Sequence, residues 1–369
     1  MLRSSHEAWM RFAIKLAEKG RSAVSPNPMV GACVVRCGRL ISSGYHEKFG
    51  GPHAERYALE KAGHRARGAT LYVTLEPCAT WQKTPPCVPL IKEKGIREVV
   101  IGSLDPNPLN HGKGVRFLRK NNIRVTVGIL SKAVQEQNEG FFKYITEKRP
   151  FVTLKMAQTL DGKIATHKGL SRWISCPKSR NFVHELRARH DAVLVGKNTF
   201  YKDNPRFTIR RNAKSLMSGK PWKVVVVSGG EDLSKQTRFF EDERLGVLVF
   251  PEDRTKDVLK NTASLKHSLA FLPVKSKKGK LNIPELLKKL ASLGITTLLV
   301  EGGGELAWSF LETHCVDRLY WIIAPKIFGG RQSKTSVEGS GVDIPSKAFL
   351  CRDSRVFKLG DDWVWTGHF

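Results

Sequence analysis

The chain is 369 residues long and 41% hydrophobic, which is enough to bury the cores of two globular domains. Its 62 lysine and arginine residues exceed its 34 aspartate and glutamate residues, and the net charge of +28 either favours an anionic partner, such as nucleic acid or a small phosphorylated ligand, or reflects only a solvated lysine-rich surface. No apolar run reaches the roughly 20 residues that cross a bilayer, and seven cysteines do not make a disulfide framework, so we exclude a membrane span and expect a reducing cytoplasm.

The first predicted elements are a helix and a hairpin. Apolar residues recur at helical spacing within Glu7–Lys19. Further on, Val30–Val35 and Leu40–Gly44 predict two strands joined by a tight turn. We interpret Cys33, on the first strand, and Cys37, in the turn, as a core thiol and a surface thiol rather than metal ligands.

A histidine, a glutamate and two cysteines then follow at the boundaries of predicted elements. His53 and Glu55 fall in the first turn of a predicted helix that Pro52 precedes. A predicted strand runs directly into Cys78, and Cys87 begins another helix. Helix starts favour negative charge, which helps to hold thiolates there.

These residue types suit a hydrolytic zinc site. Zinc takes nitrogen and sulfur ligands tetrahedrally, and three protein ligands leave the fourth position for water. We predict that His53, Cys78 and Cys87 bind Zn²⁺. Glu55 would take a proton from the water and pass it to leaving ammonia, as in zinc-dependent base deaminases. Eight residues separate the two cysteines, however, whereas two separate them in the nucleic-acid and cytidine deaminases.

The remainder of the first half alternates between strands and helices. The predicted strands are Ile96–Ile101 and Ile123–Val127, and the predicted helices are Gly114–Asn121 and Ser131–Tyr144. This pattern predicts an α/β fold, a three-layer sandwich. The charged, proline-ended stretch 146–150 marks a boundary, so we predict domains at 1–148 and 149–369.

The second half alternates in the same way. Its predicted strands are Phe151–Ala157, Ala192–Val195, Lys223–Val227, Gly246–Phe250, Thr297–Val300 and Arg318–Ile323, with helices such as Ser179–Arg189 and Ile283–Leu293 between them. Such alternation predicts a largely parallel sheet that binds ligands at the carboxyl ends of its strands. The glycine run 302–304 after one strand offers bare backbone NH groups to a phosphate. It is not the Rossmann fingerprint, so nothing local proves a nicotinamide cofactor.

The cysteine spacing and several longer motifs resemble the deaminase domain of the bifunctional riboflavin-biosynthesis deaminase/reductases. The matching stretches are Pro26-Asn27-Pro28-Met29-Val30-Gly31, Gly44-Tyr45-His46, Gly51-Pro52-His53-Ala54-Glu55, Thr74-Leu75-Glu76-Pro77-Cys78, Thr84-Pro85-Pro86-Cys87 and Asp105-Pro106-Asn107-Pro108. The resemblance implies a cytidine-deaminase-like fold, with Asn27, His46 and Lys83 contacting the pyrimidine or its ribose phosphate.

One loop departs from the family pattern. Ala79-Thr80-Trp81-Gln82 stands where the family usually has serine, histidine, histidine or tyrosine, and glycine. Because that loop is expected to help hold the substrate, the change bears on substrate affinity and leaves zinc binding untouched.

The second half resembles the reductase domain of the same family, whose fold is similar to dihydrofolate reductase. The matching stretches include Leu160-Asp161-Gly162-Lys163, Ser171-Arg172-Trp173-Ile174-Ser175, the segment from Gly196 to Thr199 and Val300-Glu301-Gly302-Gly303. The resemblance implies that NADPH reduces the ribosyl C1′ of the deaminated pyrimidine to a ribityl chain. Its implied cofactor contacts are Ala157, Trp173, Thr199, Asp203, Ser228, Gly302, Gly303 and Gly304. Its implied substrate contacts are Ser171, Arg187, Phe207, Arg210 and Glu301, with Lys155 as the catalytic residue that, with Glu301, steers protons at the sugar O4′.

The leading hypothesis is a two-step enzyme of riboflavin biosynthesis whose partner is a small phosphorylated pyrimidine. A nucleic-acid base deaminase with a basic accessory domain is the first alternative; the net charge of +28 favours it and the cysteine spacing argues against it. The second alternative is a non-catalytic binding protein whose deaminase half no longer has activity. The altered loop favours this alternative, and the intact zinc ligands argue against it. The sequence leaves the oligomeric state open, a homo-oligomer included.

Overall fold

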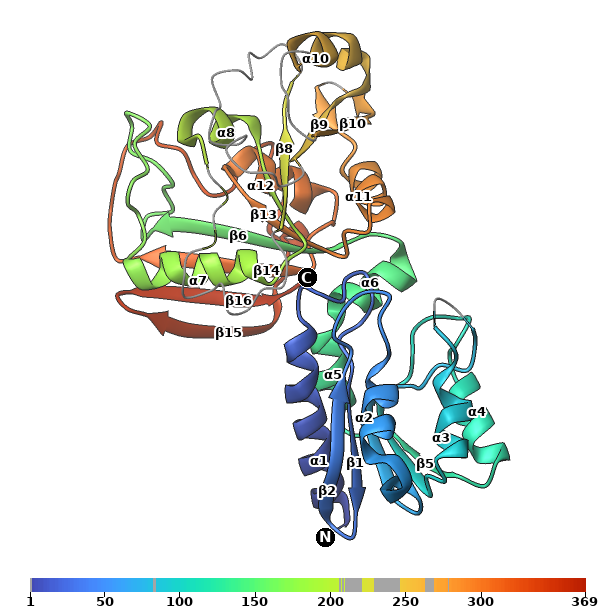
Figure 1. The fold of residues 1–369 in the computed structure, drawn as a ribbon. Helices are drawn as coiled ribbons and strands as arrows, with labels where there is room; N and C mark the ends of the chain where they lie inside the picture. The colour runs from blue at the N-terminus through green and yellow to red at the C-terminus, as the bar shows by residue number, and fades with distance from the viewer. Residues whose placement is uncertain are drawn as a thin grey trace. The chain divides into compact units, whose positions relative to one another are not determined.

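A computed structural model describes residues 2–81, 84–205, 207, 209, 221–228, 246–262, 269–277 and 279–369. The chain divides into two compact units, Met1–Lys148 and Arg149–Phe369 (Figure 1). Each unit has its own main sheet and its own buried apolar core.

The first unit is built on a five-stranded sheet. Its strands are β1 (Gly31–Arg36), β2 (Arg39–Tyr45), β3 (Thr70–Leu75), β4 (Glu98–Ser103) and β5 (Arg124–Val127). Their order across the sheet is β2-β1-β3-β4-β5, with β1 antiparallel to both neighbours and the β3–β4 and β4–β5 pairs parallel. The predicted hairpin is the β1–β2 pair. Along it, Cys33 is buried and Cys37 exposed, as predicted.

Helices cover both faces of this sheet. They are α1 (Leu2–Ala17), α2 (Ala54–Ala62), α3 (Cys87–Glu93), α4 (Lys113–Lys120), α5 (Ser131–Gln137) and α6 (Glu139–Glu147). Helices α1 and α5 pack on one face, where Met10, Tyr72 and Val100 belong to one core cluster, and α2, α3 and α4 pack on the other, around Leu59 and Leu71 (Figure 1). The predicted three-layer sandwich is confirmed.

The predicted helix over Ser131–Tyr144 is instead two helices, because the chain breaks at Asn138. This residue has a φ of −115° and a ψ of 20°, outside the helical range. Its buried side-chain amide bridges the backbone of Met29, accepting from the NH at 2.8 Å and donating to the carbonyl at 3.0 Å. The prediction of a single helix was wrong because this long-range pair of hydrogen bonds outweighs the local helical pattern.

The second unit is built on a nine-stranded sheet. Its strands are β6 (Phe151–Thr159), β7 (Ala192–Val195), β8 (Trp222–Val226), β9 (Gly246–Pro251), β10 (Leu269–Val274), β13 (Thr297–Glu301), β14 (Arg318–Ala324), β15 (Arg352–Leu359) and β16 (Asp362–His368), and a separate hairpin joins β11 (Ser276–Lys277) to β12 (Lys280–Leu281). Their order is β10-β9-β8-β7-β13-β6-β14-β16-β15. All pairs from β10 to β14 are parallel, and β16 pairs antiparallel with both β14 and β15.

Helices again cover both faces. They are α7 (Pro177–Ala188), α8 (Lys197–Asp203), α10 (Thr255–Thr262), α11 (Ile283–Ser292) and α12 (Gly304–Glu312). One core includes Leu290 of α11 and Phe310 of α12; another includes Leu186 of α7, Phe200 of α8 and Val258 of α10. The predicted largely parallel sheet is confirmed.

The parallel strands of the second unit end at one edge of the sheet. Strand β13 lies between β7 and β6, and its last residue, Glu301, is opposite Val195 of β7 and Lys155 of β6. Ligands of open α/β sheets bind at this edge. The segments that follow β7 and β13 therefore begin side by side.

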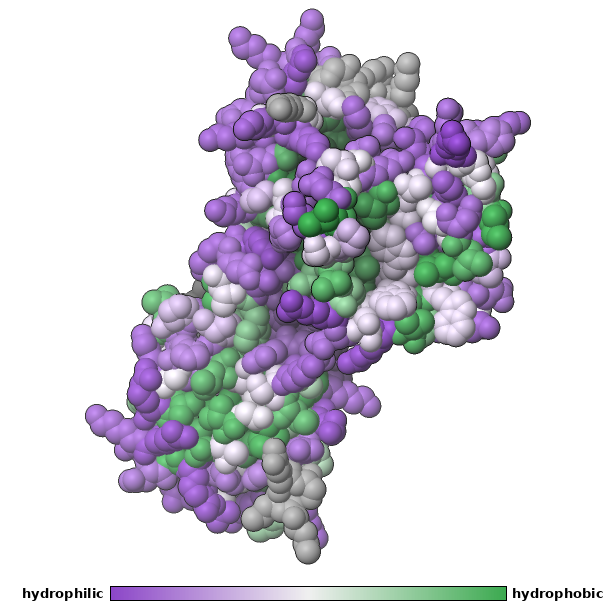
Figure 2. Space-filling model, turned by 180° about the vertical axis from the view of Figure 1, so that it is seen from behind, coloured by the Kyte–Doolittle hydropathy of each residue, from purple (hydrophilic) through white to green (hydrophobic). Residues whose placement is uncertain are grey.

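Hydrophilic side chains cover most of the face shown in Figure 2, and apolar residues gather in smaller separate patches (Figure 2). None of the helices in the described part of the chain combines the length and the apolar composition that a bilayer crossing requires.

We expect Asn138→Ala to loosen the segment before β1, because the Met29 NH and carbonyl lose their buried partners. Hydrogen exchange should show the opening free energy of the Met29 amide falling by about 2 kcal/mol. Asn121→Ala is the control, because the Asn121 amide donates only to the carbonyl of Phe117 one turn earlier. Unchanged exchange at Met29 would contradict the bridging role of Asn138.

Candidate active sites

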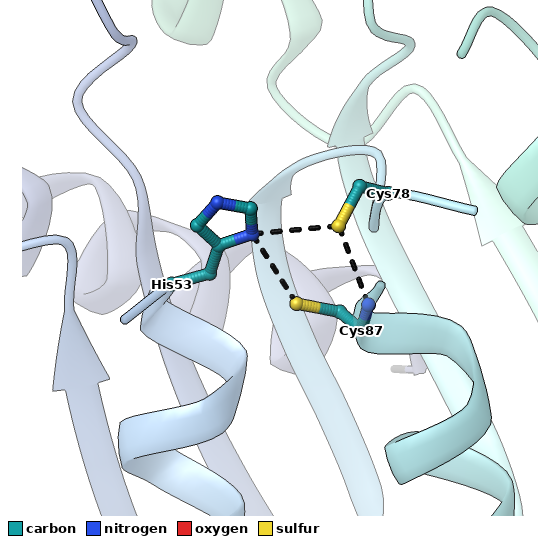
Figure 3. A group of neighbouring side chains, drawn as sticks. All are labelled: His53, Cys78 and Cys87. Carbon is teal, nitrogen blue, oxygen red and sulfur yellow. Dashed lines mark hydrogen bonds between the residues drawn. The ribbon is translucent and has the colours of Figure 1, made fainter. Parts of the chain in front are cut away.

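Three side chains from different elements of the first unit meet at one point. His53 is the residue that precedes α2, with an extended backbone (φ −76°, ψ 159°), and Cys87 is the first residue of α3. Cys78 lies in the segment that follows β3. Figure 3 shows the three side chains pointing toward one another (Figure 3).

The geometry of this cluster fits a metal ion. The Nδ1 atom of His53 lies 3.4 Å from the Sγ atoms of both Cys78 and Cys87. The three potential ligand atoms all lie within 4.8 Å of one another. One nitrogen and two sulfurs form a donor set that zinc prefers, with a fourth tetrahedral position left over.

Neighbouring groups set the charge of the two cysteines. The hydrogen bond from Cys87 lowers the pKa of the Cys78 thiol to about 4, despite burial, and His53 adds to the effect. The same hydrogen bond and burial raise the pKa of Cys87 well above its usual value. The Cys78 sulfur also accepts the backbone NH of Cys87 at 3.3 Å. The site therefore stabilises a thiolate, which is the form that binds a metal.

Glu55 lies in the first turn of α2, next to this cluster. Its side chain is 3% exposed, and burial raises the pKa of its carboxyl group. The carboxyl group interacts with the charges of His53 and Cys78 and forms a hydrogen bond with Cys87. A buried carboxyl with a raised pKa beside a metal site is suited to accept and return a proton.

The second ring nitrogen of His53, Nε2, also has a hydrogen-bond partner. This nitrogen lies 3.2 Å from the Thr84 hydroxyl, and a ring that offers Nδ1 to a metal donates from Nε2. In the sequence, Thr84 stands out only as part of the Thr84-Pro85-Pro86-Cys87 motif. Nothing in the local pattern signals this contact, because the two positions are 31 residues apart in the sequence.

A second buried carboxylate fixes the loop that carries Cys78. Glu76 is 4% exposed and accepts the backbone NH groups of Asp105, Gly112 and Val115 at 3.3, 2.9 and 3.1 Å. The segment that these bonds hold contains Asn110, whose Oδ1 accepts the NH of Ala79 at 2.8 Å. The residues on both sides of Cys78 are therefore tied to one segment.

The predicted pyrimidine contacts have different placements. His46 is 2% exposed; its Nδ1 lies 2.9 Å from the carbonyl oxygen of Pro52 and its Nε2 lies 3.1 Å from Nδ2 of Asn27. Its ring packs edge-on against that of His53 at 5.6 Å. Both ring nitrogens of His46 are thus engaged within the protein. Lys83 lies outside the described residues.

The altered loop is described in part. Thr80 carries a buried hydroxyl that finds no hydrogen-bond partner within the described structure. Trp81 is 73% exposed. Gln82 lies outside the described residues. The loop therefore presents a free indole surface beside the segment of Cys78.

In the second unit, three charged side chains from adjacent elements form a compact cluster. Arg187 of α7 holds Glu301 of β13 in a fork, with Nε at 2.6 Å from Oε1 and Nη2 at 2.9 Å from Oε2. Lys155 of β6 places its Nζ 3.6 Å from Oε2 of Glu301. All three side chains are at most 20% exposed. We call this group the Lys155–Arg187–Glu301 cluster.

The cluster shifts the pKa of each member. Although burial opposes it, the charges of Arg187 and Lys155 lower the pKa of Glu301 to about 2. Burial lowers the pKa of Lys155, and the charge of Arg187 lowers it further, while Glu301 acts in the other direction. An ammonium group with a lowered pKa releases its proton more readily, as an acid catalyst must.

Most of the predicted cofactor contacts lie on or just after neighbouring strands of the sheet. Ala157 lies on β6, Thr199 and Asp203 lie on α8 directly after β7, and Ser228 follows β8. The Ser228 hydroxyl accepts from Nζ of Lys197 at 2.7 Å. Burial raises the pKa of Asp203. The strand order places these residues along the carboxyl edge of the sheet.

Trp173 and the glycine run contribute different surfaces. Trp173 is 58% exposed, and the guanidinium of Arg180 lies 4.5 Å from its ring centre. Gly303 precedes α12, and an added Cβ there would meet only the tip of Ile164 at 4.0 Å. At Gly304 a Cβ would lie 2.6 Å from the Thr335 carbonyl oxygen, and at Gly302 it would lie 2.9 Å from Leu306. Packing against backbone therefore requires a glycine at Gly304, whereas at Gly302 only the tip of the Leu306 side chain would have to shift, and Gly303 leaves open backbone.

The remaining predicted substrate contacts differ in their burial. Phe207 is 2% exposed and packs in the core cluster with Phe200, so its ring is part of the hydrophobic core. Ser171 lies, half-buried, in the segment between β6 and α7. Arg210 lies outside the described residues.

Asp161 holds two segments of the second unit together, a role that the sequence did not predict. Its carboxylate accepts the Thr159 hydroxyl at 2.6 Å and the backbone NH groups of Phe328 and Gly329 at 3.1 and 2.7 Å. These bonds connect the end of β6 to the loop after β14. The hydrogen bond from Thr159, with those from the two backbone NH groups, lowers the pKa of Asp161 to about 2.

Both units match known protein families. Residues 3–103 match the family model described as the cytidine and deoxycytidylate deaminase zinc-binding region. Residues 150–365 match the model described as the RibD C-terminal domain.

The whole chain is similar to curated proteins and to solved structures. The riboflavin biosynthesis protein RibD of Aquifex aeolicus is 42% identical, over 99% of this chain and 98% of that protein; RibD of Synechocystis is 37% identical, over 99% and 96%. The diaminohydroxyphosphoribosylaminopyrimidine deaminase/5-amino-6-(5-phosphoribosylamino)uracil reductase of Thermotoga maritima superposes with a TM-score of 0.83 at 38% identity, over 100% of this chain and 99% of that one. Acinetobacter baumannii RibD gives a TM-score of 0.86 at 29% identity, over 100% and 99%.

We expect Thr84→Val to lower zinc affinity by roughly tenfold or more, because the His53 ring loses the acceptor that orients it. Competition with a chromogenic chelator measures this directly, without reference to activity. Thr84→Ser keeps the hydroxyl and should bind zinc as the unmodified protein does. Equal affinity of the valine variant would exclude this role for Thr84.

Proposed function

The chain belongs to the family of bifunctional riboflavin-biosynthesis deaminase/reductases, and we propose that its two compact units divide the two reactions between them. The protein deaminates diaminohydroxyphosphoribosylaminopyrimidine and reduces the ribosyl group of the product to a ribityl chain. Residues 1–148 form the deaminase domain and residues 149–369 the reductase domain. The first alternative was a nucleic-acid deaminase with an accessory basic domain. Because the second unit matches a reductase domain, this alternative is not supported.

The His53–Cys78–Cys87 cluster is the observation that carries the deaminase assignment, because its donor set fits Zn²⁺. When bound, zinc supplies Lewis acidity that lowers the pKa of the attacking water to about 7. Glu55 takes the proton of that water and delivers it to the leaving amino group. Its burial beside the cluster supports both halves of this transfer, because the raised pKa lets the carboxyl group keep the proton between the two steps.

Substrate binding in the first unit draws on residues around the zinc ligands. Asn27 and Lys83 contact the pyrimidine or its ribose phosphate, as in the family pattern. His46 acts at the same place but through its two hydrogen bonds, which hold Asn27 and the Pro52 carbonyl next to His53. The exposed Trp81 offers a flat apolar surface where the family usually has a histidine or tyrosine.

In the second unit NADPH supplies the hydride. Ala157, Trp173, Thr199, Asp203, Ser228, Gly302, Gly303 and Gly304 hold this cofactor along the carboxyl edge of the sheet. Open backbone at Gly303, before α12, supports a phosphate contact there. Gly304 acts by letting the surrounding segments approach closely.

Lys155 and Glu301 handle the protons of the reduction. The resemblance assigns them to the sugar O4′, where opening of the ring requires a proton. Lys155 donates it, since burial and the nearby Arg187 ease its deprotonation. Ser171 and Arg210 contact the substrate, and Phe207 supports the site from the core.

We place the protein in a reducing cytoplasm. The cysteines at the zinc site act as thiolates, and all seven cysteines are free of disulfides in the structure. Disulfide-free chains with metal-binding thiols are typical of that compartment.

Glu55→Gln tests the deaminase assignment. We expect this variant to keep its zinc and to release no ammonia, because an amide cannot accept the proton of the water. NADPH oxidation with the deaminated substrate should continue at the normal rate. Glu60→Gln, a change at an exposed position of α2, is the matched control. Loss of both activities in a folded Glu55→Gln protein would refute the division between units.

Lys155→Met is the reciprocal test. We expect at least a roughly hundredfold loss of NADPH oxidation, because the proton donor is gone, while ammonia release stays unchanged. The deaminated intermediate should accumulate and be visible by chromatography. Lys168→Met, at an exposed loop position, controls for the loss of a positive charge. Normal reduction by Lys155→Met would remove Lys155 from the mechanism.

A further inference from the structure

We propose that Arg180 and Lys326 are positioning residues of the reductase site, which hold Trp173 in the orientation that the cofactor meets. Trp173 lies in the segment between β6 and α7, Arg180 lies on α7, and Lys326 follows β14. The proposal deepens the proposed function and rests on it, because that function assigns Trp173 to NADPH.

The guanidinium group of Arg180 lies over the indole of Trp173. Its central carbon, Cζ, is 4.5 Å from the ring centre, a distance at which the ring face attracts a cation. Its Nη1 donates to the carbonyl oxygen of Ser175 at 2.6 Å. Both contacts reach residues 173–175, so Arg180 fixes the indole relative to α7 and to the segment that carries it.

Lys326 holds the main chain of Trp173. Its Nζ donates to the carbonyl oxygen of Trp173 at 2.7 Å. A charged donor makes a stronger hydrogen bond than a neutral one. The indole and the backbone of Trp173 are therefore held separately, by cations from two elements that are far apart in the sequence.

The backbone that carries Lys326 is itself fixed. The carbonyl oxygen of Lys326 accepts the NH of Leu160 at 2.8 Å. The carboxylate of Asp161 accepts the NH groups of Phe328 and Gly329 at 3.1 and 2.7 Å. These bonds attach the loop after β14 to the end of β6, so the Lys326 side chain extends toward Trp173 from a fixed point.

The surroundings of Trp173 connect it to another proposed cofactor contact. Arg172, the preceding residue, donates from Nη2 to the carbonyl oxygen of Asp203 at 2.9 Å, at the end of α8. Trp173 itself is 58% exposed, so more than half of its surface stays open to a ligand although Arg180 lies over the ring. An exposed indole offers a flat apolar surface on which a planar ring of NADPH can pack.

Holding the ring in advance has a consequence for binding. A large exposed side chain without fixed contacts occupies several rotamers, and ordering it when a ligand binds reduces the affinity. The contacts of Arg180 and Lys326 order Trp173 before the cofactor arrives. Both residues should therefore contribute to NADPH affinity, and they should do so only while the indole is present.

A double-mutant cycle tests this dependence, with the NADPH affinity of the full-length protein measured from the nicotinamide fluorescence on binding. We expect Trp173→Ala to raise Kd by roughly tenfold, because a stacking surface is lost. Arg180→Met and Lys326→Met should each raise Kd by roughly threefold to fivefold. In the Trp173→Ala background neither substitution should raise Kd further, because both residues act through the indole.

Fluorine NMR of protein labelled with fluorotryptophan observes the ring directly, without cofactor. The chain has eight tryptophans, and the resonance lost in Trp173→Phe identifies Trp173. Arg180→Met and Lys326→Met should shift this resonance and leave the others in place, which also shows that each variant is folded. Where one of the two variants does not fold, the other decides the question. Lys178→Met, which removes an exposed charge of α7 two residues before Arg180, is the control and should change neither the resonance nor Kd.

Direct contact between Arg180 and the cofactor gives the opposing outcome. In that case Arg180→Met raises Kd by the same factor with and without the indole of Trp173, and the proposal is overturned. An unshifted Trp173 resonance in both variants, or full NADPH affinity of Trp173→Ala, overturns it as well. These results are distinct from failure of the proposed function, in which the unmodified protein itself neither binds nor oxidises NADPH.

Discussion

A carboxylate removed from water must be compensated by hydrogen-bond donors or by cations, and each unit of this protein arranges its site around one such group. In the first unit Glu76 accepts three backbone NH groups and ties the segment before Cys78 to a distant loop. In the second unit Glu301 lies between Arg187 and Lys155. The segment that carries Cys78 in one case and the Lys155 side chain in the other are positioned against these carboxylates.

The two carboxylates differ in the charge of the groups that compensate them. Backbone NH groups carry no net charge, so they compensate Glu76 without adding a cation to the site; burial, with a contribution from the charge of Glu76, raises the pKa of Asp105 in the same segment. Side-chain cations do carry charge: burial lowers the pKa of Lys155, Glu301 acts in the other direction, and the charge of Arg187 lowers it further. The first arrangement suits a site whose charge a metal supplies. In the second arrangement the compensating charges belong to side chains of the protein itself.

The zinc site shows how strongly the surrounding structure orients a small set of ligands. His53 is held on both sides, by the Thr84 hydroxyl at Nε2 and by the ring of His46. The departure of this chain from its family, at Thr80 and Trp81, lies outside that supporting set. The altered loop therefore leaves the three potential metal ligands together, and it adds an exposed indole at Trp81.

The sequence by itself determined the local patterns: the β1–β2 hairpin, the alternation of strands and helices, and the order of His53, Glu55, Cys78 and Cys87. Periodicity and residue type are local properties, and the motif resemblance added the family and the two reactions. The sequence did not predict the exposed edge strand β15. This strand has no buried apolar face, so it lacks the alternation of apolar and polar residues that predicts a strand.

Only the tertiary structure decided which side chains touch. Asn138 breaks a helix because it bonds to Met29 over 109 residues, and Arg187 turns to Glu301 over 114 residues. Contacts of this kind depend on how distant elements pack, and a periodic pattern along the chain carries no record of them.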